Sequence, residues 1–298
     1  MRELNTTERR ALARISTAAG GMLIVAADQR NSMKAVMNAP DGADSITVEG
    51  LRAAKADLVT HLANHGPAIL LDPEVAVPQV IDDDVLDRDT ALVVGMDASG
   101  YETVDGLRFT RLVDGVTARK IREVGGDAAK MLYYLRTDQQ SLDSRVGDEI
   151  RKLIQECEAE GVLVIIEILV YQLPDESDED YARIFPRLVE EAAKFSVDCG
   201  AKVLKLQYPG SEEACKAVTE AAGGAPWAVL SAGVDHETFI EQVRIAVSNG
   251  ASGAMAGRSL WKDSLSVDPA DRESLLATRA RPRLAELSAV IDEALGQR

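Results

Sequence analysis

The sequence predicts an α/β protein consisting of a single (β/α)8 TIM barrel, and three observations support this prediction. Eight short apolar runs, many of them rich in β-branched residues, recur along the chain. Stretches with helical spacing separate most of these runs and end in glycine, a common helix stop. The length of 298 residues also fits, because such barrels typically need about 250.

An open, doubly wound sheet is the alternative architecture. Its two common nucleotide-binding signatures are GxGxxG after the first strand and GxxxxGK[ST], and neither occurs in this chain. Continuous apolar strands suit a parallel sheet that is covered by helices. The closed barrel is therefore favoured.

The expected strands lie, in chain order, at 22–29, 68–73, 91–97, 128–135, 162–169, 201–208, 226–233 and 252–261. The clearest helical stretches between them lie at 48–66, 142–161, 180–200 and 236–250. Flanking helices are expected at about 6–18 and about 283–296. No linker rich in proline, glycine or serine and no internal repeat interrupts the series, so one domain over residues 1–298 is the simplest organisation.

The charge balance disfavours two classes of partner. Asp and Glu number 49 against 33 Lys and Arg, a formal net charge of −16 that disfavours nucleic acid and anionic membrane surfaces. Neither a run of about 18 apolar residues nor a secretory signal is present, so we expect a cytoplasmic protein. The three cysteines lack CxxC spacing and are expected to be reduced thiols. The sequence is compatible with a homo-oligomer as well as with a monomer.

Ionisable side chains occur in the middle of the apolar strands. Side chains of a barrel strand alternate between the interior and the helices, so Lys205 on the sixth strand shares the inward face with Val203 and Gln207. The same count turns Glu167 on the fifth strand and Lys130 on the fourth into the interior. A buried pair that merely neutralises itself is one interpretation, but three ionisable groups on adjacent strands favour a functional site.

A buried lysine suits covalent attack on a carbonyl carbon. The attacking amine must be neutral, and desolvation together with a second ammonium, Lys130, is expected to lower the pKa of Lys205. The resulting iminium is an electron sink for carbon–carbon cleavage, while Glu167 moves protons. Metal-dependent enolisation is disfavoured because the few histidines form no ligand set, and no GxSxG elbow indicates a hydrolase. No metal or other cofactor is expected.

The ends of the seventh and eighth strands form a candidate anion site. In barrels this pair of loops often binds phosphate through glycine amides, and an arginine adds a forked cation. The candidates are Ser231, Gly233, Gly257 and Arg258. Alternatively, the glycines serve only tight turns.

Two longer connections are expected near the mouth of the barrel. Residues 98–111 could form a lid, although a surface loop is the simpler expectation. The acidic stretch 174–182 would repel an anionic ligand unless it points away from the mouth.

Seven segments, spread over nearly the whole chain, carry a family resemblance. They are AADQR at 26–30, AILLDPE at 68–74, GDAAKMLYY at 126–134, IIEIL at 165–169, VLKLQYP at 203–209, WAVLSAGVD at 227–235 and GASGAMAGRSLW at 250–261. Together they resemble the class I tagatose 1,6-bisphosphate aldolases and the related sulfofructose-phosphate aldolases. The resemblance implies a (β/α)8 barrel that forms a Schiff base with its substrate without a metal.

The resemblance also implies roles for individual residues. The implied catalytic positions are Lys205 as the Schiff-base lysine, Glu167 as the carboxylate and Lys130 as the assisting lysine. The implied substrate-binding positions are Asp28, Gln29, Arg30 and Gln207, and the implied anion contacts include Ser231 and Arg258. Gln207 departs from the family, which usually carries glutamate there, and this departure bears on the choice of substrate.

The expected function is the cleavage of a ketose 1-phosphate with a second anionic group at carbon six, as in tagatose 1,6-bisphosphate, to dihydroxyacetone phosphate and a three-carbon aldehyde. Cleavage of sulfofructose 1-phosphate to sulfolactaldehyde is the alternative within the family. A non-catalytic regulatory protein that binds sugar phosphates and a barrel isomerase with Glu167 as base are the alternatives from other classes. The expected partner is a small sugar phosphate or sulfosugar phosphate.

Overall fold

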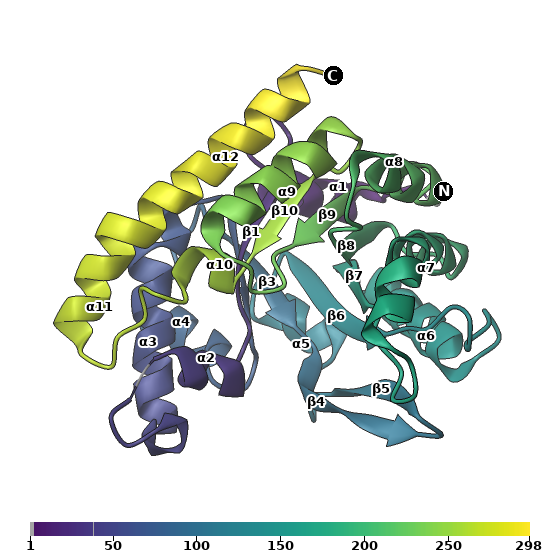
Figure 1. Cartoon of the computed structure of the whole chain (residues 1–298). Coiled ribbons are helices and arrows are strands. Elements are labelled where there is room, and N and C mark those ends of the chain that lie inside the picture. Colours follow the sequence, from purple (N-terminus) through teal and green to yellow (C-terminus); the bar gives the residue numbers. More distant parts are fainter. Residues whose placement is uncertain (1–2, 38) are drawn as a thin grey trace.

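The computed structural model describes residues 3–37 and 39–298, and a closed barrel of parallel strands lies at its centre (Figure 1). The strands follow one another around the barrel in the order β1-β10-β9-β8-β7-β6-β3-β2. Their bounds are Met22–Ala27 (β1), Ala68–Leu71 (β2), Ala91–Gly95 (β3), Ala128–Tyr134 (β6), Leu163–Leu169 (β7), Val203–Gln207 (β8), Trp227–Leu230 (β9) and Gly253–Ala256 (β10). Each strand lies within one of the expected apolar runs, and the predicted (β/α)8 fold is confirmed.

Helices cover the outside of the barrel, as Figure 1 shows for α3, α7, α9 and α12. The α-helices are Thr6–Arg14 (α1), Asn31–Val36 (α2), Val48–His61 (α3), Val77–Asp82 (α4), Ala118–Glu123 (α5), Arg145–Glu160 (α6), Asp178–Asp198 (α7), Glu212–Ala221 (α8), His236–Ser248 (α9), Arg258–Trp261 (α10), Pro269–Leu275 (α11) and Arg281–Gly296 (α12). Short 3-10 helices lie at Ala43–Ser45 and Ala63–His65, and a π-helical segment, Leu276–Ala280, joins α11 to α12.

The N-terminal helix closes the amino end of the barrel. α1 begins after Asn5, which forms a capping box with Glu8. It ends at Arg14, before the expected residue 18, because the chain folds back so that Ser16 pairs with Met22 at the start of β1. Ala11 and Ile15 belong to the apolar cluster that fills the barrel interior, so this end is sealed by hydrocarbon.

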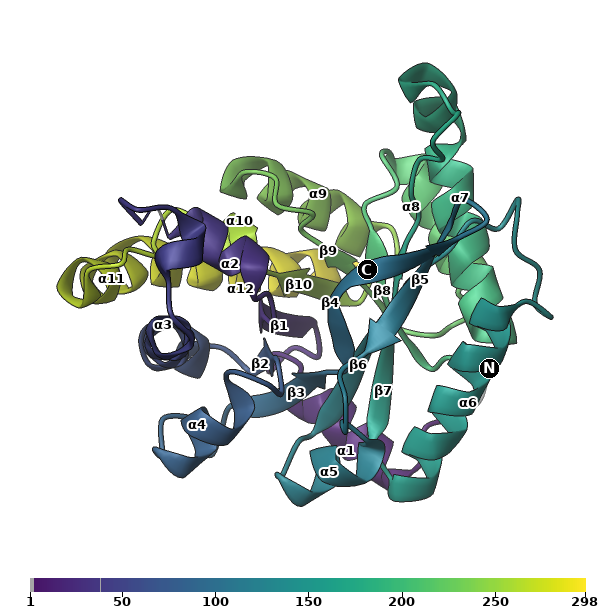
Figure 2. The same cartoon turned by 90° about the horizontal axis from the view of Figure 1, so that it is seen from below.

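Residues 97–112 form a β-hairpin instead of the surface loop that the sequence suggested. Its strands, β4 (Asp97–Val104) and β5 (Leu107–Leu112), pair in the antiparallel direction. The turn residues Asp105 and Gly106 have φ angles of 50° and 79°, the left-handed pair that an Asp-Gly hairpin turn requires. The hairpin projects from the carboxyl end of the barrel, and Figure 2 shows it in front of β6, β7 and β8.

The three cysteines, Cys157, Cys199 and Cys215, are buried and free, in keeping with the expectation of reduced thiols. Burial raises the pKa of Cys157 and Cys215 to about 12, which keeps both thiols protonated and unreactive. In the described part of the chain, no helix combines the length and the apolar character needed to cross a membrane.

Candidate active site

A cavity of about 400 Å³ opens at the carboxyl ends of the barrel strands. Its walls come from the loop after β1, the base of the β4–β5 hairpin, strands β6 to β8 and the start of α10. Because β1 stops at Ala27 and β3 at Gly95, the side chains of Asp28 and Asp97 lie just beyond the strands and line this space. The cavity therefore gathers polar groups from segments that are far apart in the sequence.

Glu167 bridges the two inward lysines. It lies beside Lys205 in the register of β7 and β8, and its Oε1 atom is 2.9 Å from Lys205 Nζ. Its other oxygen, Oε2, lies 2.9 Å from Lys130 Nζ on β6. Lys205 is only 5% exposed and Lys130 only 2%, so both ammonium groups are removed from bulk water. The three inward residues chosen by strand alternation do converge.

Lys130 has two further carboxylate partners. Its Nζ atom lies 2.7 Å from Asp28 Oδ2 and 2.8 Å from Asp97 Oδ1. Asp97 is a site residue that the sequence reasoning missed, although it follows a strand just as Asp28 does, and that position was the available signal. Lys130 is thus enclosed by three carboxylates, and it organises them around the cavity rather than standing as a bare cation beside Lys205.

The local charges fix the protonation of this cluster. Burial lowers the pKa of Lys130, but the charges of Asp28, Asp97 and Glu167 outweigh it and hold that pKa well above its usual range. Burial raises the pKa of Asp28 and Glu167, yet the two lysines reverse the effect and both pKa values lie below normal. The pKa of Asp97 is raised, because burial and its two carboxylate neighbours outweigh Lys130. Asp97 is therefore the carboxylate that takes up a proton most readily.

The three residues after β1 play different parts. Asp28 Oδ1 and Gln29 Oε1 are buried without a hydrogen-bond partner within the described chain, and both residues line the cavity. Arg30 has its partners already: its guanidinium donates to Glu74 at 2.6 Å, to the Asp97 carbonyl at 2.8 Å and to Ser99 at 3.1 Å. Asp28 and Gln29 can thus accept from substrate hydroxyl groups, while Arg30 ties the base of the hairpin to the loop after β1.

A fully buried ion pair supports that loop from behind. Lys55 on α3 contacts Asp72 Oδ2 and the carbonyl of Ala27, each at 2.5 Å. Asp72 Oδ1 in turn accepts from the backbone N–H groups of Glu74 and Val75. The pair therefore fixes the end of β1 and the segment that carries Glu74, the partner of Arg30. Strand patterns in the sequence do not reveal this connection.

The four predicted anion-site residues come together at the ends of β9 and β10. The backbone N–H of Gly257 points to Ser231 Oγ at 3.3 Å. Gly233 has a φ of 83°, and a Cβ atom there would lie 3.3 Å from the guanidinium carbon of Arg258. The glycine therefore allows both the turn and the close approach of Arg258, which lines the cavity.

Gln207 is the last residue of β8 and follows Lys205 by two residues, on the same face of the strand. Its amide oxygen accepts a hydrogen bond from the backbone N–H of Val170 at 2.8 Å, just after β7. In the described structure it joins two neighbouring strand ends and is not among the residues that line the cavity.

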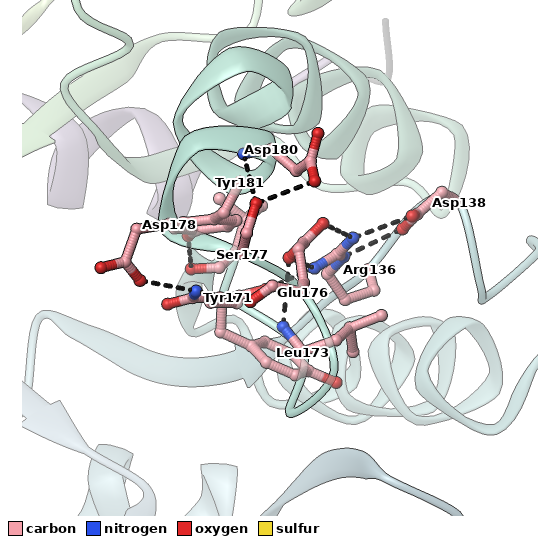
Figure 3. Close-up of polar contacts among 11 residues, drawn as sticks. Arg136, Asp138, Tyr171, Leu173, Glu176, Ser177, Asp178, Asp180 and Tyr181 are labelled. Carbon is pink, nitrogen blue, oxygen red and sulfur yellow. Dashed lines mark hydrogen bonds and ion pairs between the residues drawn. The ribbon is translucent and has the colours of Figure 1, made fainter.

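One residue of the acidic segment after β7, Glu176, pairs with a buried arginine. Arg136, which follows β6 and is 1% exposed, makes paired contacts with Asp138 and with Glu176, and it also donates to the carbonyl of Tyr171 (Figure 3). Ser177 caps α7 by accepting from the backbone N–H of Asp180. Glu176 is thus directed to Arg136 and does not line the cavity in the described structure.

Within the described residues, no group of three His, Cys, Asp or Glu side chains is arranged to hold a metal ion. His61 ends α3, and His65 lies in the separate 3-10 helix that follows. His236 begins α9 and contacts Glu286 at 2.8 Å. The carboxylates that do gather in the cavity surround the Lys130 ammonium.

Comparison with known proteins assigns the chain to a family. Residues 22–263 match the family model of the DeoC/LacD aldolases. Since the match covers most of the chain, the protein belongs to the DeoC/LacD family of aldolases, which are carbon–carbon lyases.

The chain is also similar to individual aldolases. It is 30% identical over 305 residues to the tagatose 1,6-diphosphate aldolase of Lactococcus lactis subsp. lactis, covering 93% of this chain and 90% of that protein. Tagatose 1,6-diphosphate aldolase 2 of Streptococcus agalactiae serotype III is 30% identical over 287 residues, with 88% and 87% covered.

Among solved structures, an archaeal fructose 1,6-bisphosphate aldolase superposes with a TM-score of 0.63 at 17% identity, covering 97% of this chain and all of that one. The fructose-bisphosphate aldolase of Slackia heliotrinireducens gives a TM-score of 0.67 at 15% identity, with 100% and 95% covered. At these identities the two structures support the fold.

Proposed function

We propose that this chain is a class I aldolase that cleaves a ketose 1-phosphate with a second anionic group at carbon six, through a Schiff base on Lys205. The contact between Lys205 Nζ and Glu167 Oε1, 2.9 Å long inside a cavity of about 400 Å³, carries the proposal. The similarity of the chain to tagatose 1,6-diphosphate aldolases makes tagatose 1,6-bisphosphate the first substrate to test. The products are dihydroxyacetone phosphate and a three-carbon aldehyde.

The first stage joins the lysine to the sugar. Lys205 gives a proton to Glu167 Oε1 and attacks the carbonyl carbon C2 of the open-chain ketose, forming a carbinolamine. Glu167 returns the proton to the C2 oxygen and then carries a second proton from the nitrogen to the same oxygen, which leaves as water when the iminium forms. Lys130, protonated among its carboxylates, holds Glu167 Oε2 at 2.9 Å, so that Oε1 stays directed at the reacting nitrogen.

The second stage breaks the carbon–carbon bond. Glu167 takes the proton of the C4 hydroxyl, the C3–C4 electron pair moves to the iminium, and C4 leaves as the aldehyde. The enamine that remains takes a proton at C3. Water then adds to the restored iminium, which releases dihydroxyacetone phosphate and regenerates Lys205.

We assign the 1-phosphate to Arg258, Ser231 and the amides beside Gly233 and Gly257. C1 is bonded to the carbon that Lys205 attacks, and β10 lies only two strands from β8 in the barrel. A guanidinium fork and backbone amides are the donors that a phosphate monoester accepts best. Asp28 Oδ1 and Gln29 Oε1, which lack partners in the described chain, then remain for the sugar hydroxyls.

Borohydride trapping tests the proposal directly. The protein is reduced in the presence of tagatose 1,6-bisphosphate, fructose 1,6-bisphosphate or sulfofructose 1-phosphate, and the modified peptide is identified by mass spectrometry. We expect an adduct on Lys205, cleavage of the same substrate, and activity that EDTA does not change.

Three results would overturn the assignment. An EDTA-sensitive reaction without an adduct would indicate metal-dependent chemistry. Tight binding with neither adduct nor cleavage would indicate a regulatory sugar-phosphate binder. Interconversion of two sugars without splitting would indicate an isomerase.

A further inference from the structure

Two arginines near the mouth of the barrel have guanidinium groups without an acceptor. Within the described residues, the side chains of Arg108 and Arg258 make neither a hydrogen bond nor an ion pair. Two other arginines of this region do have partners: Arg30 contacts Glu74, and Arg136 contacts two carboxylates. In a chain with a net charge of −16, two unpaired cations beside one cavity require an explanation.

Aromatic rings hold Arg108 in place. Its guanidinium carbon lies 4.7 Å from the ring centre of Tyr101, 4.6 Å from that of Tyr171 and 5.9 Å from that of Tyr134. Tyr134 itself lines the cavity and packs edge to face against the other two rings. Ring faces attract the flat guanidinium but leave its N–H groups without acceptors, so the cation is fixed and still able to bind an anion.

The strand order places Arg108 and Arg258 on opposite sides of the barrel. Arg258 directly follows β10, and Arg108 contacts the ring of Tyr134 at the end of β6. Going round the barrel, three strands separate β10 from β6 in either direction, and β8 with Lys205 lies on one of these paths. A ketose that extends from Arg258 past Lys205 therefore directs its far end toward Arg108.

We propose that Arg108 binds the anionic group at the far end of the substrate, a tetrahedral oxyanion on carbon six. This inference rests on the proposed function, because it assumes that Arg258 binds the 1-phosphate and that the sugar bonds to Lys205. The β4–β5 hairpin then supplies specificity: it carries Arg108 and Tyr101 to the mouth, and Tyr171 accepts a hydrogen bond from the Arg108 backbone at 2.9 Å.

The test measures binding of ligands that the enzyme cannot cleave. Dissociation constants are determined by calorimetry for a hexitol 1,6-bisphosphate, a hexitol 1-phosphate and a hexitol 1-phosphate with a sulfonate at carbon six. The proteins are the wild type, Arg108→Met, which keeps an unbranched side chain against the tyrosines, and Arg145→Met. Arg145 is the matched control, because it lies 4.3 Å from the ring of Phe109 on the same hairpin and pairs with Glu102, away from the cavity.

We expect Arg108→Met to reduce the preference for the doubly anionic hexitol over the 1-phosphate by about 10- to 100-fold, the usual effect of losing hydrogen bonds to a charged group. Arg145→Met should change this preference by less than about two-fold, and Arg108→Lys should retain part of it. Of the two C6 groups, the one that loses more affinity in Arg108→Met identifies the natural oxyanion.

Equal losses in Arg108→Met and Arg145→Met would overturn the inference, because they would indicate only that the hairpin had loosened. An unchanged preference in Arg108→Met would overturn it as well. Hexitols have no carbonyl, so these constants do not depend on a Schiff base. If borohydride traps no adduct but Arg108→Met loses the preference as expected, only the proposed reaction is refuted. If the adduct forms but Arg108→Met keeps the preference, only the role of Arg108 is refuted.

Discussion

Lys202 and Lys205 lie three residues apart at β8, and both are buried, yet they meet different surroundings at the two ends of the barrel. At the amino end, Lys202 Nζ contacts both oxygens of Glu8 at 2.8 Å and Glu158 at 2.9 Å. At the carboxyl end, Lys205 pairs with one carboxylate among the described residues, that of Glu167. The amino end is closed by α1, whereas the carboxyl end opens into the cavity.

The difference shows that a buried lysine does not make a site by itself. Around Lys202, two carboxylates, those of Glu8 and Glu158, share one ammonium. Around Lys205, three carboxylates share two ammonium groups, and two buried acceptors, Asp28 Oδ1 and Gln29 Oε1, lack partners in the described chain. A cavity and unsatisfied acceptors beside Lys205 are what distinguish the end of the barrel that carries the proposed site.

The sharpest test of this comparison exchanges the two lysines for methionine. Lys205→Met should abolish both adduct formation and turnover, because the nucleophile is lost. Lys202→Met should keep both, but should lower the free energy of unfolding by about 3 kcal/mol, because Glu8 is left buried without its cation. Trapping assays and urea denaturation measure the two effects, and a catalytic loss in Lys202→Met without a loss of stability would contradict the comparison.

Glu167→Gln should produce the next largest effect. The amide keeps the size of the side chain but cannot take up a proton, so kcat should fall by about 10²- to 10⁴-fold and the adduct should form more slowly. Steady-state kinetics and the time course of trapping measure this change. A fall of less than about ten-fold would show that Asp28 or Asp97 moves the protons instead.

Lys130→Met should weaken the protein in a pH-dependent way. Removing the ammonium leaves Asp28, Asp97 and Glu167 buried together, which should cost about 3–5 kcal/mol of unfolding free energy at pH 8. The cost should be smaller at pH 5. Urea denaturation of the variant and the wild type at both pH values measures the difference, and an equal cost at both would contradict it.

Proton binding explains why the loss of unfolding free energy in Lys130→Met should be larger at pH 8 than at pH 5. In the wild type the pKa values of Asp28 and Glu167 are lowered, so their stabilising contribution is present at neutral pH and is lost only as pH falls through those lowered values. In the variant, Lys205 still pairs with Glu167, but without the Lys130 ammonium burial raises the pKa values of the carboxylates. The folded state then holds protons that the unfolded state has released, and stability falls as pH rises.

The smallest expected effect concerns Gly233. Gly233→Ala should cost about 1–2 kcal/mol in backbone strain, because its φ is 83°, and the new methyl group should displace Arg258 and raise KM for the 1-phosphate. Gly210→Ala is the matched control, since its φ is 108° but no atom lies within 4 Å of the added carbon. Thermal unfolding and KM measured together separate strain from displacement, and equal KM values would rule out contact between Arg258 and the phosphate.

Much of the fold and part of the site could be predicted from the chain alone. Apolar runs located all eight barrel strands, and alternation turned Lys130, Glu167 and Lys205 inward, because both properties are local and periodic. The β4–β5 hairpin was missed as a hairpin even though Asp105-Gly106 is a strong turn signal, since its polar strands resemble a loop. Asp97 was missed with it, because Asp97 is the first residue of the hairpin strand β4.

The sequence by itself determined the barrel, the inward lysines and the glycine-rich ends of β9 and β10, because each depends on residues close together in the chain. Only the tertiary structure decided which charges pair: Lys130 with Asp28, Asp97 and Glu167, Lys55 with Asp72, and Arg108 with tyrosines in place of a carboxylate. These pairings depend on distances of a few ångströms between side chains from different elements. A difference of that size separates an ion pair from a free cation, and periodicity along one strand carries no information about it.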